Sequence, residues 1–519
     1  MRESTRLLLN SLVNVATGLV NMAVQLVVVP VITHAIGKAA YGVYVIVAGL
    51  TYYTPFLHMG MASAVTRYGA AHLARREYDE LNATVNTSVA YYRAIAVVFL
   101  IFAGVVAWYL TDLFQIDPAL WKVSRWCVLI VGVVEAMNLW MGPVGGLLWS
   151  LERYDLFNLP LTAFRFVRLG LLLVLLPWFD QATGLVCVTA VMVLTNFLPT
   201  LVQRLLAVRY TPHLKMDLRL ARKRLLVPLI GFGLATLTWH WSQAMLDYVA
   251  FLLIGRYLTT VQVGEYQIPC FVLLAVHMLV DASTVVMEPA ASRLHATDRR
   301  EALREILLRG GTYAAGVSVG GCAGLAILAP MVLSLWVGDA FLHVSGVLTL
   351  LAIGRSVYYI QTGTYHTLTG MGKQRVPGLM SLVCVGVIAI LQAGVLGWTD
   401  WGLLGVAGVT TAGLTIGWGL AIPIYACVQV GIPVGTYYRT VLFRPVVSCL
   451  PAALGWGAIR YLGVGYGWLQ LAFALLSGGA LLCVGWWFIL FDDRDRRMIR
   501  DKLNALRDRI GVHPPGPPP

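Results

Sequence analysis

Long apolar stretches recur along the whole chain, and they constrain its fold more than any other feature. Examples are residues 97–110, 225–254 and 376–397. A helix needs roughly 20 predominantly apolar residues to cross the ~30 Å hydrocarbon layer of a membrane. A membrane β-barrel would instead show short segments of alternating polarity, and the sequence has no such run. We therefore predict an all-α, polytopic membrane protein.

The composition agrees with this class. Hydrophobic residues make up 58% of the chain and charged residues 12%, and the mean hydropathy is +0.75. A soluble domain carries about 25% charged residues, so this chain cannot present a water-facing surface on all sides. The eight cysteines are scattered singly, without a CxxC or a Cys/His ligand spacing. They are interpreted as small packing residues, and no metal or cofactor is predicted.

Apolar runs and the breakers between them predict about fourteen transmembrane helices. The first run begins near Leu7 and is too long for a signal-peptide core, so it is predicted to be a true span. The predicted helices occupy residues 8–34, 40–66, 84–111, 121–149, 157–178, 183–207, 225–254, 263–288, 309–336, 344–370, 376–397, 403–428, 441–461 and 466–491.

The basic residues predict the orientation. Most of the 38 lysines and arginines, including Arg204 and those after it up to Arg224, fall in connections on one side. The other side has Lys38, Lys122, Arg125, Arg256 and Arg460. By the positive-inside rule both termini are predicted to be cytoplasmic. The net charge of +13 is then explained by basic loops facing an anionic inner leaflet, and no nucleic-acid partner is expected.

The C-terminal segment "DDRDRRMIRDKLNALRDRI" places Ile499, Leu503, Leu506 and Ile510 on one helical stripe ringed by arginines. This pattern predicts an interfacial helix on the inner leaflet; the alternative is a solvated, frayed end. Its "DDRD" start resembles a DxD metal motif, but acidic residues at a helix start need no metal. The final "HPPGPPP" is predicted to be a disordered, proline-rich tail.

One pattern occurs twice. "AIGKAAYGVY" (35–44) and "LIGRYLTTVQVGEYQI" (253–268) each close one apolar run and open the next. "AVTRYGAAHLARREYDEL" and "VVMEPAASRLHATDRREAL" follow at corresponding places. We interpret the first twelve helices as two six-helix lobes, related by a pseudo-two-fold axis along the membrane normal. The predicted parts are 1–210, 211–432, two additional helices over 433–491, and the cytoplasmic interfacial helix and tail over 492–519.

Polar residues form stripes inside six predicted spans. A charge at the bilayer centre costs roughly 2.5–3.5 kcal/mol on insertion scales, so these side chains are expected to face a wet interior between the lobes. Hydrogen bonding between helices is the alternative for any single stripe. The stripes are Asn10, Asn14, Thr17, Asn21 and Gln25; Asn82, Asn86 and Arg93; Asn158, Arg165 and Arg168; Thr236, His240, Gln243 and Asp247; His277, Asp281, Thr284 and Glu288; and Arg355, Tyr359, Thr362, His366 and Thr369.

The lobes differ in the sign of these charges. Arginines dominate the first lobe, and guanidinium groups suit phosphate. Acids and histidines dominate the second, where they would bind a coupling ion or a proton or pair with one another. The candidate substrate-binding residues are Arg93, Arg165, Arg168, Arg355, Asn14, Asn21 and Gln25, and the candidate coupling residues are Asp247, Asp281, Glu288, His240 and His277.

Several segments resemble a known family. The opening "LVVVPVITHAIGKAAYGVYVIVAGL" with "LHMGMASAVTRYGAAHLA", and later "DYVAFLLIG…VGEY" and "GMGKQRVPG", resemble Wzx-type polysaccharide flippases. These belong to the multidrug/oligosaccharidyl-lipid/polysaccharide exporter superfamily. The resemblance covers about residues 5–430, and its motifs are loose: mostly Gly, Tyr and a charge at helix ends.

The resemblance implies translocation of an undecaprenyl-diphosphate-linked oligosaccharide across the bacterial inner membrane, for O-antigen, capsule or exopolysaccharide. It implies a lipid-linked glycan substrate, with a polysaccharide polymerase and a chain-length regulator as partners. A cation-coupled multidrug or small-molecule exporter of the same superfamily remains open. The first helix lacks the acidic residue that such exporters often carry, which disfavours this alternative.

Two further alternatives remain. One is a membrane enzyme, such as a polymerase or glycosyltransferase that acts on the same lipid carrier. The longest outer connections, "DLFQIDPALWK" and "WVGDAFLHVSG", are short for such an enzyme, and no P-loop occurs. The other is a scaffold without transport. We predict a transporter and not an enzyme.

Overall fold

A computed structural model describes residues 3–53, 57, 61–151, 153–462 and 467–509. This part of the chain is built from helices joined by short connections and contains no strand. The prediction of an all-α protein is confirmed. Its long helices fit the periodicity and length of the apolar runs, because a helix satisfies all its backbone hydrogen bonds internally in a membrane.

The first predicted break lies inside one continuous element. α1 (Glu3–Gly49) contains a kink at Gly37, whose φ is 74°. Glycine adopts this left-handed conformation without the steric cost of a side chain. α1 therefore contains the first predicted helix and the start of the second. The rest of the second predicted helix corresponds to η1 (Leu50–Tyr53) and the start of α3 (Met61–Arg75).

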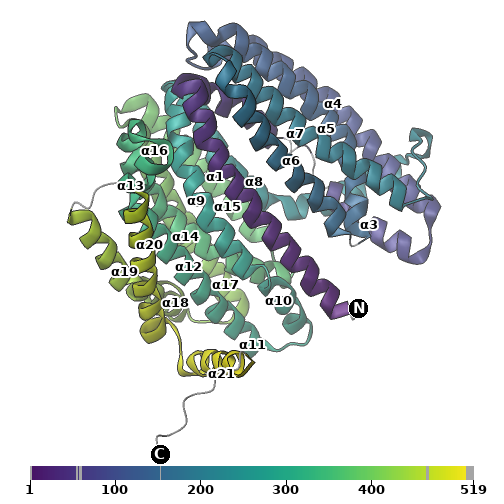
Figure 1. Cartoon of the computed structure of the whole chain (residues 1–519). Helices are drawn as coiled ribbons and strands as arrows, with labels where there is room; N and C mark the ends of the chain where they lie inside the picture. The colour runs from purple at the N-terminus through teal and green to yellow at the C-terminus, as the bar shows by residue number, and fades with distance from the viewer. Residues whose placement is uncertain (1–2, 54–56, 58–60, 152, 463–466, 510–519) are drawn as a thin grey trace, which may run out of the picture.

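The remaining helices of the first half lie close to their predicted ranges. They are α4 (Tyr78–Leu113), α5 (Trp121–Ser150), α6 (Tyr154–Leu175) and α7 (Gln181–Tyr210). α4 packs on α5, and α5 packs on α7. These four helices form the bundle at the upper right of Figure 1.

The second half begins with α8 (Leu226–Tyr257) and α9 (Thr260–Thr284). Its other helices are α10 (Met287–Ala296), α11 (Arg300–Glu305), α12 (Gly311–Ile327), α13 (Ala329–Val337), α14 (Ser345–Gly370), α15 (Arg375–Trp398), α16 (Gly402–Gly413) and α17 (Ile422–Val430). The ninth predicted helix is bent by 74° between α12 and α13. A π-helical segment, Leu414–Ala421, joins α16 to α17.

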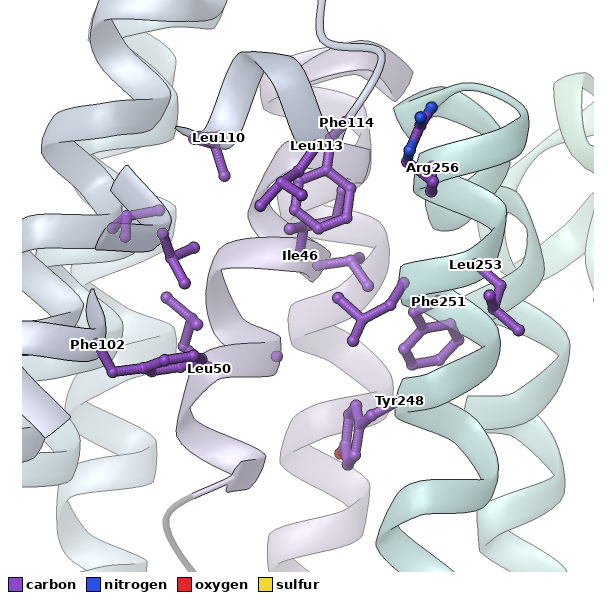
Figure 2. A pocket seen from close by; sticks show the side chains of 15 residues that line it. Ile46, Leu50, Phe102, Leu110, Leu113, Phe114, Tyr248, Phe251, Leu253 and Arg256 are labelled. Atoms are coloured by element: carbon purple, nitrogen blue, oxygen red, sulfur yellow. The ribbon is translucent and has the colours of Figure 1, made fainter. Parts of the chain in front are cut away.

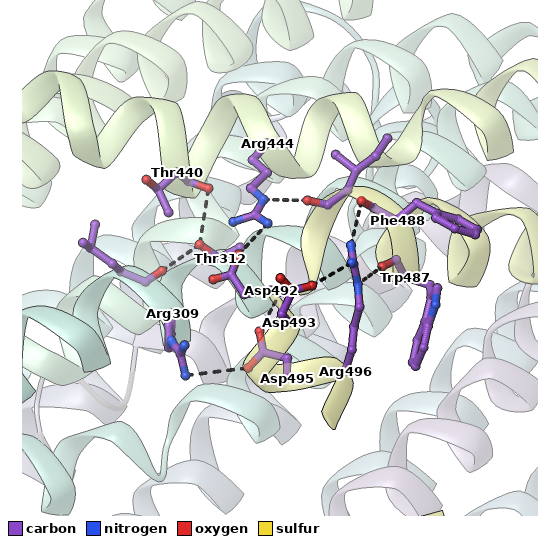
Figure 3. Close-up of polar contacts among 12 residues, drawn as sticks. Arg309, Thr312, Thr440, Arg444, Trp487, Phe488, Asp492, Asp493, Asp495 and Arg496 are labelled. Atoms are coloured by element: carbon purple, nitrogen blue, oxygen red, sulfur yellow. Dashed lines mark hydrogen bonds and ion pairs between the residues drawn. The ribbon is translucent and has the colours of Figure 1, made fainter. Parts of the chain in front are cut away.

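The C-terminal part consists of α18 (Val434–Tyr437), α19 (Arg444–Tyr461), α20 (Trp468–Gly485) and α21 (Asp493–Arg509). α21 is tied to the bundle by ion pairs at its start (Figure 3). Asp492 accepts a hydrogen bond of 2.7 Å from Arg444, and Asp495 lies 3.7 Å from Arg309. The "DDRD" motif is thus an acidic helix start that contacts arginines. Of the predicted apolar stripe, the side chains of Leu503, Leu506 and Ile510 lie outside the described part, as does the proline-rich tail.

Eleven helices of the described part are long and apolar enough to cross a membrane, or twelve if the bent pair is one span. The predicted number of fourteen is therefore not confirmed, although the polytopic class is. Large apolar side chains are exposed on α4, α6, α15 and α20, where a bilayer would cover them. Among them are Val97, Ile101, Trp108, Val174, Ile390 and Leu476.

α1 runs between the two groups of helices (Figure 1). It packs on α6 and α7 of the first half and on α9 of the second. We use the name basic end for the end of the bundle where α3, α10, α11 and α21 lie. Sequence predicts that this end is cytoplasmic. The Gly37 kink lies at the opposite end.

The repeated turns of the sequence meet each other at that opposite end. A Cβ atom on Gly42 would overlap the carbonyl oxygen of Thr260, and one on Gly264 would lie 2.8 Å from the Tyr41 ring. Each turn therefore needs its glycine because the other turn lies against it. The two glycines occupy the corresponding place in "YGVY" and "VGEY", which supports the repeat.

Candidate functional site

Polar side chains of the second half meet in two clusters on the inner sides of α8, α9, α10 and α14. In the first, Arg355 of α14 forms an ion pair with Asp247 of α8. The Arg355 side chain is 7% exposed and that of Asp247 is 26% exposed. The structure thus joins a predicted substrate-binding arginine to a predicted coupling residue, and the charge of Arg355 is matched within the protein.

The second cluster is centred on His366 of α14. Its Nε2 lies 3.2 Å from Asp281 of α9, and its Nδ1 lies 3.1 Å from Glu288 of α10. Both carboxylates are about half exposed, whereas the imidazole is largely buried. One ring therefore bridges two acids that are each about half exposed. A group in this setting can exchange a proton or hold a cation between carboxylates.

Aromatic rings fill the space around the clusters. His277 of α9 lies against Tyr359, with ring centroids 4.8 Å apart, and against Tyr358 at 6.0 Å. Trp239 of α8 stacks on Tyr365 of α14 at 3.9 Å. His277 lies one helical turn before Asp281 and forms no ion pair with the residues that the structure describes. Of the predicted coupling residues, it is the one that packs among aromatic rings.

The arginines of the first half have different surroundings. Arg168 of α6 is buried and donates hydrogen bonds to Thr195 at 2.8 Å and to Asn196 at 2.5 Å, both on α7. Arg165 lies one turn earlier on α6 and is half-buried. Arg168 is therefore held against α7 by two side-chain hydrogen bonds.

Arg93 and Arg204 form a second basic pair. The Arg93 guanidinium carbon lies 4.7 Å from the centre of the Trp140 ring, and its charge repels that of Arg204 on α7. Neither arginine forms an ion pair in the part of the chain that the structure describes. The Arg204 Nη1 and Trp140 Nε1 atoms are buried without a hydrogen-bond partner there.

Sequence reasoning counted Arg204 with the basic residues of a cytoplasmic connection, although it also falls inside the predicted helix 183–207, and the structure places it on α7. α7 extends to Tyr210, three residues beyond the predicted end at 207, and Arg204 lies within it. Glu135 of α5 is buried and accepts a 3.3 Å hydrogen bond from Asn138. In the sequence, Arg204 belongs to a helix that also contains the polar residues Thr195 and Asn196, and this is the signal that points to it.

The polar stripe of α1 is only partly described. Asn21 is buried, and its Oδ1 has no hydrogen-bond partner in the described part; Gln25 is half-buried. The side chains of Asn14 and His240 lie outside the described residues, so their positions are not assigned. Asn82 and Asn86, which share the stripe of Arg93, instead bind the connection between α7 and α8 through His213 and Lys215.

An apolar pocket lies between α1, α4, α5 and α8 (Figure 2). Its volume is about 430 Å³. Phe102, Leu113 and Phe114 line one side, Phe251 lines another, and Arg256 lies at the rim. Such a lining suits hydrocarbon and has too few polar groups for a diphosphate.

An ionic cluster closes the end opposite the basic end. Lys38 of α1 lies 3.1 Å from Glu265 of α9, which also lies 3.0 Å from His343, before α14. Lys38 lies over the Phe341 ring at 4.5 Å. The sequence pointed to the twin turns but not to this contact, because the partners are more than 200 residues apart and only the fold brings them together.

Comparison with known proteins agrees with this architecture. A family model described as "Polysaccharide biosynthesis protein" matches residues 182–346. A search of curated protein sequences finds no match to the chain.

Solved structures match over much more of the chain. The lipid II flippase MurJ, in an inward closed conformation, superposes with a TM-score of 0.71 at 12% identity, over 92% of this chain and 98% of MurJ. A multidrug resistance MATE family transporter in an inward-facing conformation gives a TM-score of 0.58 at 14% identity, over 80% and 94%. A MOP superfamily transporter from Pyrococcus furiosus gives 0.56 at 14% identity, over 81% and 95%.

The similar structures are those of a flippase and of transporters, and the family description names polysaccharide biosynthesis. They confirm the resemblance that the sequence motifs indicated. The chain is a polytopic membrane protein with the same fold as the MurJ and MATE structures.

Proposed function

We propose that this protein flips a diphosphate-linked, lipid-borne oligosaccharide across the bacterial plasma membrane by alternating access. The proposal takes the two halves as lobes that open in turn toward each side of the membrane. The observation that carries it is the unmatched basic pair Arg93 and Arg204, located in spans of the first half. The acids and His366 belong to the second half.

A diphosphate provides the charge that this basic pair lacks. Two guanidinium groups repel each other, and a cation in a membrane span is costly without a counter-charge; Arg204 is partly buried, whereas Arg93 is exposed. Guanidinium forks bind phosphate oxygens in a bidentate manner. The buried N–H groups of Arg204 and Trp140, which have no partner in the described part, add two donors. A diphosphate between α4, α5 and α7 would satisfy all of these groups together.

The other candidate substrate residues have secondary places in this proposal. Arg165 and Arg168 of α6 extend the basic surface toward α7. Asn14, Asn21 and Gln25 of α1 provide amides, which suit sugar hydroxyls. Arg355 is the exception: its pairing with Asp247 favours a structural role over a direct contact with substrate.

The second half is proposed to bind the coupling ion or proton. His366 bridges Asp281 and Glu288, and the exposed sides of both carboxylates offer a path to water. A change of charge at this imidazole would alter the contacts of α9, α10 and α14 at once. His277 of α9 and His240 and Asp247 of α8 are also proposed to take part in this coupling.

The finer assignments follow from the same proposal. The oligosaccharide is one that is exported for O-antigen, capsule or exopolysaccharide, and the lipid is undecaprenyl. Both termini face the cytoplasm, and a polymerase with a chain-length regulator acts on the flipped product. The family description of polysaccharide biosynthesis supports this direction.

The test is transport by the purified protein in vesicles. A fluorescent diphosphate-linked glycolipid is placed in both leaflets, and a reductant that cannot enter the vesicle removes the outer fluorescence. We expect the protected inner fraction to move outward only with the protein present. A monophosphate-linked lipid with the same glycan is the matched control, and equal movement of both lipids would contradict the role of the diphosphate.

A cation-coupled exporter of small molecules is the second candidate function. The acid-rich cluster at Asp281, Glu288 and His366 favours it, because exporters exchange cations for substrate. In this case cationic dyes would move against their gradient when a proton gradient is imposed, and the labelled glycolipid would not move.

A further inference from the structure

At the basic end, each half of the chain has a tight turn between two helices, and the two turns have the same backbone geometry. We call each turn a corner. α3 leads into α4 through Arg76, whose φ is 59°, and α10 leads into α11 through Asp298, whose φ is 49°. At the first corner the N–H of Arg76 bonds to Leu73 and that of Glu77 to His72. The second corner repeats both bonds between the corresponding residues, Asp298 with His295 and Arg299 with Leu294.

This match pairs side chains between the halves. Glu77 of the first corner corresponds to Arg299 of the second, since each follows the left-handed residue directly. Asn82 corresponds to Arg304, since each is six residues beyond it. The second half therefore has arginine where the first half has a carboxylate and an amide.

The first corner is filled by the chain itself. Asn82 donates a hydrogen bond of 3.1 Å to the carbonyl of His213 and accepts one of 2.7 Å from the Lys215 N–H. The Tyr78 ring lies on the His213 ring, with centroids 4.0 Å apart. The connection between α7 and α8 thus occupies this corner and buries Asn82.

The corresponding corner of the second half is an open pocket of about 260 Å³. The basic residues that line it are His295, Arg299, Arg300, Arg304 and Lys373, from the α10–α11 corner and the turn after α14. Asp298 is the single acidic residue of this lining, and it is paired with Arg300 at 3.1 Å. The lining of the pocket as a whole is strongly positive, so we expect an anionic group to fill the pocket.

Two of these cations are fixed in place by α17. The Arg304 Nε donates a 3.3 Å hydrogen bond to the carbonyl of Val430, and Lys373 donates to the side chain of Gln429. α17 then ends at Gly431, whose φ of 74° only glycine adopts freely. Two basic side chains of the pocket, those of Arg304 and Lys373, are therefore held in place, whereas Arg299 is exposed.

The rim of the pocket has an exposed apolar side chain. Val428, on the last turn of α17, lines the pocket and is 71% exposed, as expected of a side chain that faces lipid. Basic pockets beside membrane spans on the cytoplasmic side recognise anionic lipid head groups. We propose that this corner pocket binds the phosphodiester head group of an anionic phospholipid from the inner leaflet, with Arg299 and Arg304 on the phosphate.

The test measures lipid binding by the full chain in detergent, with native mass spectrometry and thermal unfolding. The probes are phosphatidylglycerol, phosphatidylcholine, and inorganic phosphate or pyrophosphate. We expect phosphatidylglycerol to bind and stabilise the protein and phosphatidylcholine to do neither. Equal binding of both lipids would overturn the proposal. Stabilisation by inorganic phosphate or pyrophosphate alone, at concentrations matching the lipid, would overturn the lipid as occupant.

Substitutions at one position locate the site. Arg299→Glu introduces the residue type that the first corner has at this place. We expect it to weaken phosphatidylglycerol binding about tenfold or more, because each basic residue near the membrane surface changes the binding constant severalfold. Arg299→Lys keeps the charge and should retain most binding. Arg219→Glu makes the same change of charge in the connection between α7 and α8 and should leave binding unchanged. Equal effects of Arg299→Glu and Arg219→Glu would contradict the assignment.

Discussion

At the scale of single residues, the substrate proposal depends on two guanidinium groups that have no carboxylate partner in the described part, Arg93 and Arg204. Their arrangement differs from that of Arg355, whose charge Asp247 already matches. Three arginines inside spans thus have two distinct physical roles. The unmatched pair is available for an anion, whereas the matched one holds α8 to α14.

Arg93→Ala and Arg204→Ala are each expected to lower the rate of glycolipid movement about tenfold or more. The reason is the loss of a charge-assisted hydrogen bond to phosphate, which is worth roughly 1.5–3 kcal/mol. Arg209→Ala, on an exposed position of the same helix, is the control. Rates equal to that of the unchanged protein in both variants would contradict the role of the pair.

His366→Gln tests the proton-linked part of the proposal. The amide can keep hydrogen bonds to Asp281 and Glu288 but cannot change its charge. We expect transport by the unchanged protein to vary with pH across the range in which histidine titrates, and transport by the variant to lose this variation. His34→Gln replaces an exposed histidine and should keep the pH dependence. A variant with an unaltered pH profile would exclude His366 as the proton carrier.

Asp247→Asn and Arg355→Gln test the buried ion pair through stability. Removing one partner leaves an unmatched charge in the interior, which costs about 3–5 kcal/mol. Each single variant should therefore unfold at a lower temperature in detergent. The double variant should recover much of the loss, because neither charge remains. Equal loss in the single and double variants would show that the pair is not coupled.

At the scale of elements, the contact between α1 and α9 closes the end opposite the basic end. Gly42 and Gly264 allow the two helices to touch, and the ion pair of Lys38 with Glu265 joins them beside this contact. Both features belong to the repeated turns. The same segment that marks the repeat in the sequence thus forms the closure in three dimensions.

Gly42→Ala should open this closure, since the added methyl group would overlap the carbonyl of Thr260. A carbodiimide forms an amide between an amine and a carboxylate in direct contact, so Lys38 and Glu265 should cross-link in the unchanged protein. We expect the yield, measured by peptide mass spectrometry, to fall severalfold in the variant. Gly49→Ala is the control on the same helix, because its Cβ would meet no atom within 4 Å. An unchanged yield in Gly42→Ala would show that the contact adapts without separating the helices.

At the scale of the whole molecule, apolar periodicity was sufficient to predict the class and most helix positions. It failed at places where the chain bends without a polar break. α1 continues through Gly37, and the ninth helix bends between α12 and α13 without a loop. Periodicity reports which residues avoid water, and it contains little information on such bends.

The candidate site was predicted only in part, for a related reason. The 3.6-residue periodicity of a helix predicts which side chains share one of its faces, so the sequence already indicated the stripe with Asp281 and Glu288. The partner of a charge on another helix was not. His366 meets Asp281 and Glu288, Arg355 meets Asp247, and Arg204 lies near Arg93 only because the fold places their helices side by side.

The most direct test of the central claim follows the diphosphate-linked glycolipid between leaflets of vesicles that contain the purified protein. The account predicts that movement depends on the protein, requires the diphosphate, and falls in Arg93→Ala and Arg204→Ala but not in Arg209→Ala. Movement of the monophosphate-linked lipid at the same rate, or full activity without either arginine, would contradict it.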